Sequence, residues 1–228
     1  DNMTKKRMAA MILPIILILF VLAMFLWYFL GYRSLKIALF RIENYFCREK
    51  ETVFLGDSLT DLCHLDRCYP DCGTLYNRGI NGDTVTGVNE RLESTVLPLN
   101  PGRLVLLIGI NDLIGGKAEE ALFSDYRALL KQIGTLLPET ALFVQSLYPV
   151  SGKYAELNQA IVTFNEKLRA LCAEQEIPYI DVHAALKDKD GQMKEEYTTD
   201  GLHCTAAGYR VIAPIVAEAV FGKPPAAP

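Results

Sequence analysis

Short apolar runs alternate with longer amphipathic stretches from residue 51 onward, and this alternation constrains the fold more than any other feature of the chain. The run Arg103–Ile108 contains five consecutive apolar residues, which is typical of a strand buried on both faces. Strands that alternate with helices need crossover connections, so they form a parallel sheet covered on both sides. The pattern predicts a three-layer α/β/α domain of flavodoxin-like type over residues 51–221.

The expected elements of this domain follow from periodicity, from Gly and Pro positions and from capping residues. Asp83 or Thr84 is expected to cap the first long helix. Functional sites in such sheets form outside the carboxyl ends of the strands. We expect strands at Thr52–Leu55, Thr74–Asn77, Arg103–Ile108, Ala141–Leu147 and Tyr179–Val182, and helices at Thr84–Leu92, Ala118–Leu137, Tyr154–Gln175 and Thr205–Val220.

Residues 8–30 form an uncharged apolar stretch that contains a single proline. A helix of about 20 such residues is long enough to cross a bilayer. A cleaved signal peptide would share the preceding basic residues, but this stretch is longer than a usual signal core and no small-x-small site follows it. We expect one N-terminal transmembrane helix over residues 8–30, after a basic tail of residues 1–7.

Residues 31–50 are expected to form an amphipathic juxtamembrane segment, which either lies on the membrane, continues the span or packs against the domain. Lys and Arg are equally frequent close to both ends of the span, so the positive-inside rule gives no orientation. Short basic tails usually stay in the cytoplasm, which favours a cell-membrane protein whose large domain is extracytoplasmic. The Pro-rich tail of residues 222–228 is expected to be disordered.

Charge and cysteine content limit which classes of partner and which metals the protein is expected to bind. The chain has a formal charge of −4 although its first fifty residues are basic, so the domain itself is strongly acidic and nucleic acid is not an expected partner. Cysteine spacing around His64 matches no common zinc site, so no metal is expected. A disulfide within this group stays open because sequence cannot assign pairing, and unpaired thiols are favoured. The group comprises Cys63, Cys68 and Cys72.

Four polar blocks carry the candidate chemistry. Ser58, Gly79 and Asn111 each follow a predicted strand, so they are expected at one edge of the sheet. Each alone has an ordinary explanation, such as a helix cap for Ser58 or a turn for Gly79. Together they supply a nucleophile, a base, an acid and oxyanion donors, which is the set that a hydrolase needs. The blocks are Gly56-Asp57-Ser58-Leu59, Asn77-Arg78-Gly79, Gly109-Ile110-Asn111-Asp112 and Asp200-Gly201-Leu202-His203.

In order and over roughly residues 52–215, these blocks resemble the GDSL family, also called SGNH hydrolases. The chain is especially similar to bacterial GDSL-like lipase/acylhydrolases related to the platelet-activating-factor acetylhydrolase-like group. The resemblance implies that Ser58 is the nucleophile, that His203 is the base and that Asp200 orients the base. It assigns the oxyanion hole to the backbone N–H groups of Ser58 and Gly79 and to the side-chain amide of Asn111.

Other residues have secondary roles in this interpretation. Asp57 is expected to shape the nucleophile turn, and Asp57, Tyr148 and Pro149 are secondary candidates for contact with substrate. His183 also follows a predicted strand, but it lacks a carboxylate at the spacing that orients His203.

The expected function is that of a serine esterase that cleaves carboxylic esters through an acyl-enzyme and needs no cofactor. Small acyl groups, such as acetyl on a sugar or glycan, are the first expectation. The alternatives are a lysophospholipase or thioesterase for longer chains, an acyltransferase, and a noncatalytic glycan-binding domain of the same fold. The sequence contains no Gly-x-Ser-x-Gly elbow, no Walker A loop and no dinucleotide fingerprint. It does not define the oligomeric state.

Overall fold

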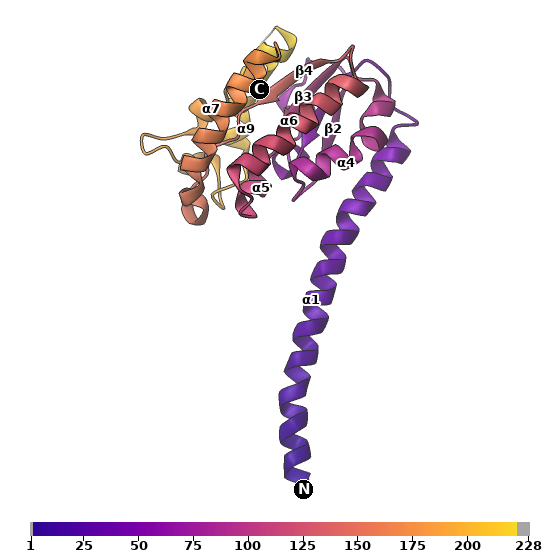
Figure 1. Ribbon diagram of the computed structural model, residues 1–228, viewed down its shortest axis with the longest axis vertical. Coiled ribbons are helices and arrows are strands. Elements are labelled where there is room, and N and C mark those ends of the chain that lie inside the picture. The colour runs from indigo at the N-terminus through magenta and orange to yellow at the C-terminus, as the bar shows by residue number, and fades with distance from the viewer. Residues whose placement is uncertain (1, 223–228) are drawn as a thin grey trace. The chain divides into compact units, whose positions relative to one another are not determined.

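The computed structural model describes the backbone of residues 2–222 and the side chains of that range except 2–11, 13, 14 and 26–30 (Figure 1). The chain divides into two units, one up to Phe40 and one from Arg41 onward. Residues 41–50, expected to belong to the juxtamembrane segment, therefore fall in the second unit. Apart from Gly222, the predicted tail of residues 222–228 lies outside the described residues.

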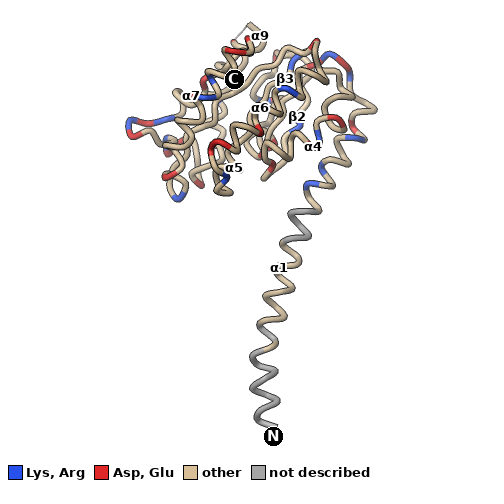
Figure 2. The backbone as a smooth tube through the Cα atoms, viewed as in Figure 1, with Lys and Arg blue, Asp and Glu red and all other residues tan. Residues whose placement is uncertain are grey.

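Helix α1 runs from Asn2 to Glu43 as one element, so the first part of the predicted juxtamembrane segment continues the helix of the apolar stretch. Its described residues between 12 and 25 include no Lys, Arg, Asp or Glu, and the tube of Figure 2 is tan there. Among the described residues, no helix is both long and apolar enough to cross a membrane. That finding does not support the transmembrane helix predicted over residues 8–30, several of whose side chains lie outside the described residues. The extracytoplasmic location stays a prediction.

A five-stranded parallel sheet forms the centre of the second unit, in the order β2-β1-β3-β4-β5. This is the flavodoxin-like order, so the predicted fold class is confirmed for this unit. All five predicted strands are present, with ends that differ by three residues or fewer. The strands are β1 (Thr52–Gly56), β2 (Leu75–Gly79), β3 (Arg103–Leu107), β4 (Ala141–Gln145) and β5 (Tyr179–Ile180).

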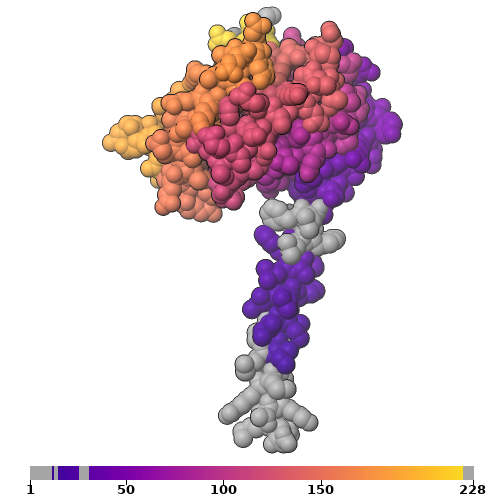
Figure 3. All heavy atoms as spheres, in the orientation of Figure 1, coloured from indigo at the N-terminus to yellow at the C-terminus, as the bar shows by residue number. Residues whose placement is uncertain are grey.

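Helices cover both faces of the sheet, as right-handed crossovers require. On one face α4 (Val85–Thr95) contacts α6 (Glu119–Leu136), which contacts α7 (Asn158–Glu174). These three lie side by side on the face seen in Figure 3. On the other face α3 (Leu65–Cys68) and α8 (His183–Leu186) contact α9 (Ala206–Phe221). Shorter elements are α2 (Ser58–Asp61), α5 (Ile110–Ile114), η1 (Leu97–Leu99), η2 (Gly152–Leu157) and η3 (Glu195–Tyr197).

The core lies between the central strand and the two helical layers. In β3, the side chains of Leu104 and Leu106 are fully buried, and so are those of their neighbours on the other face of the strand. Each such side chain stabilises the fold by about 1.5–3 kcal/mol relative to an exposed one. Helix α6 buries residues at helical spacing and ends before Pro138, which cannot donate a helical hydrogen bond. The central strands are therefore held firmly, and their carboxyl ends can position a site.

Arg78 ties the start of the second unit to the edge strand β2. Its side chain is 2% exposed, and it donates to Glu43 Oε2 at 3.1 Å and to Asn44 Oδ1 at 2.9 Å. A buried guanidinium is stable only where hydrogen-bonding partners replace its water. The segment ahead of β1 is thus a structural part of the second unit.

Replacing Asn44 with Ala is expected to lower the free energy of unfolding by about 2 kcal/mol, because a buried charged donor loses an acceptor. Urea denaturation of the full chain measures the change. Glu49→Ala, an exposed substitution in the same segment, is the control and should have little effect. Equal stability of both variants would show that Arg78 does not depend on this contact.

Candidate active site

The turn between β1 and α2 presents Ser58. Asp57 is the N-cap of α2, and its Oδ1 accepts a hydrogen bond from the Leu59 N–H at 2.9 Å. Because Asp57 occupies the cap, the Ser58 hydroxyl is not used to cap the helix. The side chain of Ser58 is therefore available for chemistry at the carboxyl end of β1, although the residue is only 2% exposed.

Three of the predicted residues form one hydrogen-bonded chain. His203 Nε2 lies 2.9 Å from Ser58 Oγ, and His203 Nδ1 lies 2.6 Å from Asp200 Oδ2. Ser58 and His203 are 145 residues apart in the sequence. This geometry suits proton transfer from the hydroxyl to an imidazole that a carboxylate orients.

A tight turn brings the imidazole to the nucleophile. Gly201 has a positive φ of 86°, and a Cβ there would lie 2.3 Å from the carbonyl oxygen of Ser151. The Ser151 N–H also donates to the Gly201 carbonyl at 2.8 Å. From α9, the Tyr209 hydroxyl donates to the Leu59 carbonyl at 2.8 Å. These contacts hold the C-terminal turn against the nucleophile helix.

Asp200 is well suited to stabilise a protonated His203. Partial burial pushes the pKa of Asp200 upward, but hydrogen bonds from the His203 side chain and from the N–H groups of His203 and Leu202 outweigh it and hold that pKa at about 2. The carboxylate is thus charged across the pH range in which proteins fold. It can stabilise the imidazolium without taking its proton.

Asn111 lies on the same edge, in α5. Its Nδ2 donates to the carbonyl of Asp83 at 2.9 Å, and an amide nitrogen has a second proton to offer. Next to it, Asp112 Oδ2 accepts from the Val85 N–H at 2.9 Å, and Asp112 Oδ1 accepts from Lys117 at 2.8 Å. Asp112 therefore fixes α5 against the start of α4.

Gly79 is placed differently from the prediction. The Gly79 N–H donates to Asn77 Oδ1 at 2.8 Å, and a Cβ on this buried glycine would lie 2.2 Å from the Asp61 nitrogen. Asn77 also donates to the carbonyls of Thr60 and Cys63 at 2.7 and 3.2 Å. Gly79 thus allows β2 to approach α2 closely, and the geometry does not support its N–H as an oxyanion donor.

Gly82 lies in the loop between β2 and α4, and its N–H is better placed than that of Gly79 to act as an oxyanion donor. It is exposed, has a positive φ of 75°, and immediately precedes Asp83, whose carbonyl accepts from Asn111. Within the described part of the chain, no acceptor is recorded for the N–H of Gly82 or of Ser58. The sequence signal that could have pointed to Gly82 is the pair Gly82-Asp83, which lies close after the block Asn77-Arg78-Gly79.

Arg91 was not foreseen. It is 1% exposed, and its Nε donates to Asp83 Oδ2 at 2.7 Å. Its Nη2 donates to the carbonyls of Gly56 and Arg78 at 3.1 and 2.8 Å. Its helical spacing places it beside Val88 and Leu92 on the buried face of α4, but the sequence does not show the acceptors that allow an arginine to be buried there.

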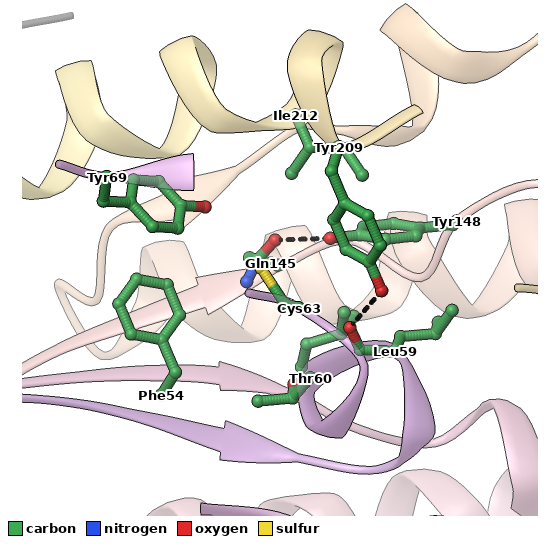
Figure 4. A pocket seen from close by; sticks show the side chains of 10 residues that line it. Phe54, Leu59, Thr60, Cys63, Tyr69, Gln145, Tyr148, Tyr209 and Ile212 are labelled. Atoms are coloured by element: carbon green, nitrogen blue, oxygen red, sulfur yellow. Dashed lines mark hydrogen bonds between the residues drawn. The ribbon is translucent and has the colours of Figure 1, made fainter. Parts of the chain in front are cut away.

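The three secondary candidates for substrate contact are buried. Asp57 is fully buried, Tyr148 is 4% exposed, and Pro149 is also buried. Tyr148 donates to Gln145 Oε1 at 2.8 Å and, with Gln145 and Tyr209, lines a small hollow against α2 that Figure 4 shows. The side chains of Gln145, Tyr148 and Tyr209 therefore pack against the inner side of α2.

His183, the other histidine that follows a strand, is buried. Its N–H donates to Ser146 Oγ at 2.9 Å, and burial lowers the pKa of its imidazole. The recorded partner of the Ser58 hydroxyl is His203, not His183.

Comparison with known proteins agrees with this geometry. A model of the GDSL-like lipase/acylhydrolase family matches residues 54–211. N-acylneuraminate cytidylyltransferase of Streptococcus agalactiae is 30% identical over 162 residues, which are 70% of this chain and 36% of that protein. Platelet-activating factor acetylhydrolase IB subunit alpha1 of Bos taurus is 27% identical over 167 residues, which are 71% of each protein.

A solved structure shares the fold. It comes from Streptococcus pneumonia, is provisionally described as a platelet activating factor, and has a TM-score of 0.80 at 24% identity, covering 87% of this chain and 97% of that one. This chain spans only about a third of the length of the cytidylyltransferase relatives.

The chain belongs to the GDSL-like lipase/acylhydrolase family, because the family model covers more than half of it. The predicted resemblance to this family is thereby confirmed.

Replacing Asp57 with Asn is expected to change how stability depends on pH. Burial, and the nearby charges of Asp83 and Asp112, raise the pKa of Asp57 from 3.8 to about 7 against the hydrogen bond from Leu59. The stability that comes from a neutral Asp57 is fully present below its ordinary pKa and is lost as the pH rises through about 7. The advantage of the Asn variant should therefore grow between pH 4 and pH 8.

This shift corresponds to a change on the order of 4 kcal/mol. Denaturant titrations of both proteins across that range measure it. Asp66→Asn, at an exposed position of α3, is the control. A constant difference between the Asp57→Asn variant and the wild type would contradict the raised pKa.

Proposed function

We propose that this chain is a serine esterase that hydrolyses short-chain carboxylic esters through an acyl-enzyme. The observation that carries the proposal is the chain of hydrogen bonds from Ser58 through His203 to Asp200. In the first step, His203 Nε2 takes the hydroxyl proton as Ser58 Oγ attacks the ester carbonyl carbon. The imidazolium then gives that proton to the leaving alcohol, and water releases the acyl group by the same route.

The negative charge of the tetrahedral intermediate needs preorganised donors. We assign these to the N–H of Ser58, the N–H of Gly82 and the second amide proton of Asn111. Gly82 replaces Gly79 in this assignment because the Gly79 N–H already donates to Asn77. Asp83 links the Asn111 side chain to the loop that carries Gly82, so the two donors are held as a pair.

A short acyl group is favoured over a long one. The hollow against α2 is lined by neither Ser58 nor His203, so it offers no channel for a chain attached to Ser58. A larger groove lies between the end of α6 and the start of β4, at the amino ends of the strands, whereas Ser58 lies at their carboxyl ends. A relative that shares 71% of its length with this chain is named an acetylhydrolase. Acetyl esters are therefore the first substrates to try.

Hydrolysis of nitrophenyl esters with two to sixteen carbons in the acyl group is expected to peak at the shortest chains. Ser58→Ala removes the nucleophile and should lower kcat by about 10⁴-fold or more. Thr60→Ser, which changes a neighbouring hydroxyl residue of the same helix, is the control and should remain active. A maximum at long chains would replace this proposal with a lipid esterase, and equal turnover by the Ser58→Ala variant would exclude a serine esterase.

Replacing Asn111 with Ala is expected to lower kcat by about 10²–10³-fold and to change KM little, because the lost donor acts mainly in the transition state. Steady-state kinetics on acetyl esters separate the two constants. Asn81→Ala, on the loop next to Gly82, is the matched control and should stay within about threefold of the wild type. A similar loss in both variants would point to loop disruption rather than to a missing oxyanion donor.

A further inference from the structure

Two cysteines lie face to face beside the nucleophile helix. Cys63 Sγ and Cys68 Sγ are 3.6 Å apart, and both residues are partly buried. Disulfide sulfurs lie at about 2.05 Å, so modest side-chain rotations would bring the pair to bonding distance. No other pair of sulfur atoms is recorded in contact within the described residues.

Cys63 is directly connected to the catalytic helix. Its N–H donates to the Thr60 carbonyl at 3.0 Å, and its own carbonyl accepts from Asn77 at 3.2 Å. Its side chain also lines the hollow against α2, together with Tyr209 (Figure 4). Any bond made at Cys63 therefore acts on the segment that follows Ser58.

Cys68 ends a helix that has few restraints of its own. Helix α3 has four residues, and its N-cap, His64, makes no side-chain capping hydrogen bond. Isolated helices of this length are not stable, so α3 depends on burial of Leu65 and Tyr69. A covalent link between Cys63 and Cys68 would close this segment on itself.

The two thiols also differ in the way that disulfide exchange requires. The Cys63 S–H donates to Cys68 Sγ, and this bond lowers the pKa of Cys68 while it raises the pKa of Cys63. Cys68 is also the less buried of the two. Exchange begins with the more accessible thiolate, and the second thiol then resolves the intermediate.

We propose that Cys63 and Cys68 form a reversible disulfide that braces the segment following the nucleophile helix. The oxidant is a small-molecule disulfide such as oxidised glutathione. The Cys68 thiolate attacks one of its sulfurs, a mixed disulfide forms and one glutathione thiolate leaves. Cys63 then gives its proton to water and attacks Cys68 Sγ, and the second glutathione leaves. Two protein thiols are oxidised, and one disulfide is reduced to two glutathione molecules.

The test uses the full chain in glutathione buffers of increasing oxidation, followed by intact mass and thermal melting. The wild type is expected to lose the mass of two hydrogen atoms and to melt about 5 °C higher, as closure of a six-residue loop implies, with reversal by dithiothreitol. Cys72→Ser, in the same cysteine-rich segment, is the matched control and should behave like the wild type. Cys68→Ser should lose both changes.

Two further readouts identify the bond. Cys63→Ser is expected to trap one glutathione on Cys68, because the resolving thiol is gone. In the oxidised wild type and in the Cys72→Ser variant, trypsin cleaves after Arg67, so the peptides of residues 51–67 and 68–78 should stay joined until reduction. This peptide map needs no variant that removes either partner. An unchanged mass in oxidised buffer, an unchanged melting temperature, or a link that requires Cys72 would overturn the proposal.

Discussion

The hydrogen bonds of the buried Arg91 guanidinium are the interactions on which the candidate site depends. Arg91 donates to the carbonyls of Gly56 and Arg78 and to the carboxylate of Asp83, and it is 1% exposed. A buried cation is destabilising unless its protons are matched by acceptors, so these partners are held firmly in place. Gly56 precedes the nucleophile turn, and Asp83 accepts from Asn111 through its carbonyl. One side chain thereby fixes three of the four polar blocks relative to one another.

The fourth polar block, Asp200-Gly201-Leu202-His203, lies in the C-terminal part of the chain. Its turn is held by the contact of Gly201 with Ser151, and α9 is held to α2 by the hydrogen bond from Tyr209 to Leu59. The parallel sheet makes this meeting geometrically simple, because all strands end at the same edge. Precision within hydrogen-bonding distance, however, comes from these polar contacts rather than from the packing of the core.

Much of this arrangement could be predicted from the sequence, because it depends on patterns among residues that are close together in the chain. Strand β3 is a continuous apolar run, α6 has helical periodicity that stops at Pro138, and Thr84 caps α4 as expected. The order of the polar blocks likewise pointed to Ser58 and His203, which do lie in contact. Such features depend on neighbours in the sequence, which is why they can be recognised without a structure.

The features that could not be predicted from the sequence depend on contacts between residues that are far apart in the chain. The role of Gly79 was misjudged because its N–H is occupied by Asn77 and its surface by α2, and neither fact has a signature in a short motif. The sequence likewise does not show the acceptors that allow Arg78 and Arg91 to be buried. The division of the chain after Phe40 has the same origin, since Asn44 contacts residues that are far away in the sequence. It accepts a hydrogen bond from Arg78 and donates to the carbonyls of Ser94 and Thr95.

The electrostatics at the carboxyl ends of the strands limit how the proposed mechanism could stabilise an oxyanion. Asp57, Asp83 and Asp112 lie close enough to influence one another's charge, whereas Arg91 is paired with Asp83 and Lys117 with Asp112 and Asp125. The cations recorded around this cluster are thus already neutralised. In the proposed mechanism, the N–H dipoles of the assigned donors therefore stabilise the intermediate, and their orientation does not depend on their own titration. Burial raises the pKa of Asp57 to about 7, so below that pH the side chain is neutral and does not oppose a negative charge that develops beside Ser58.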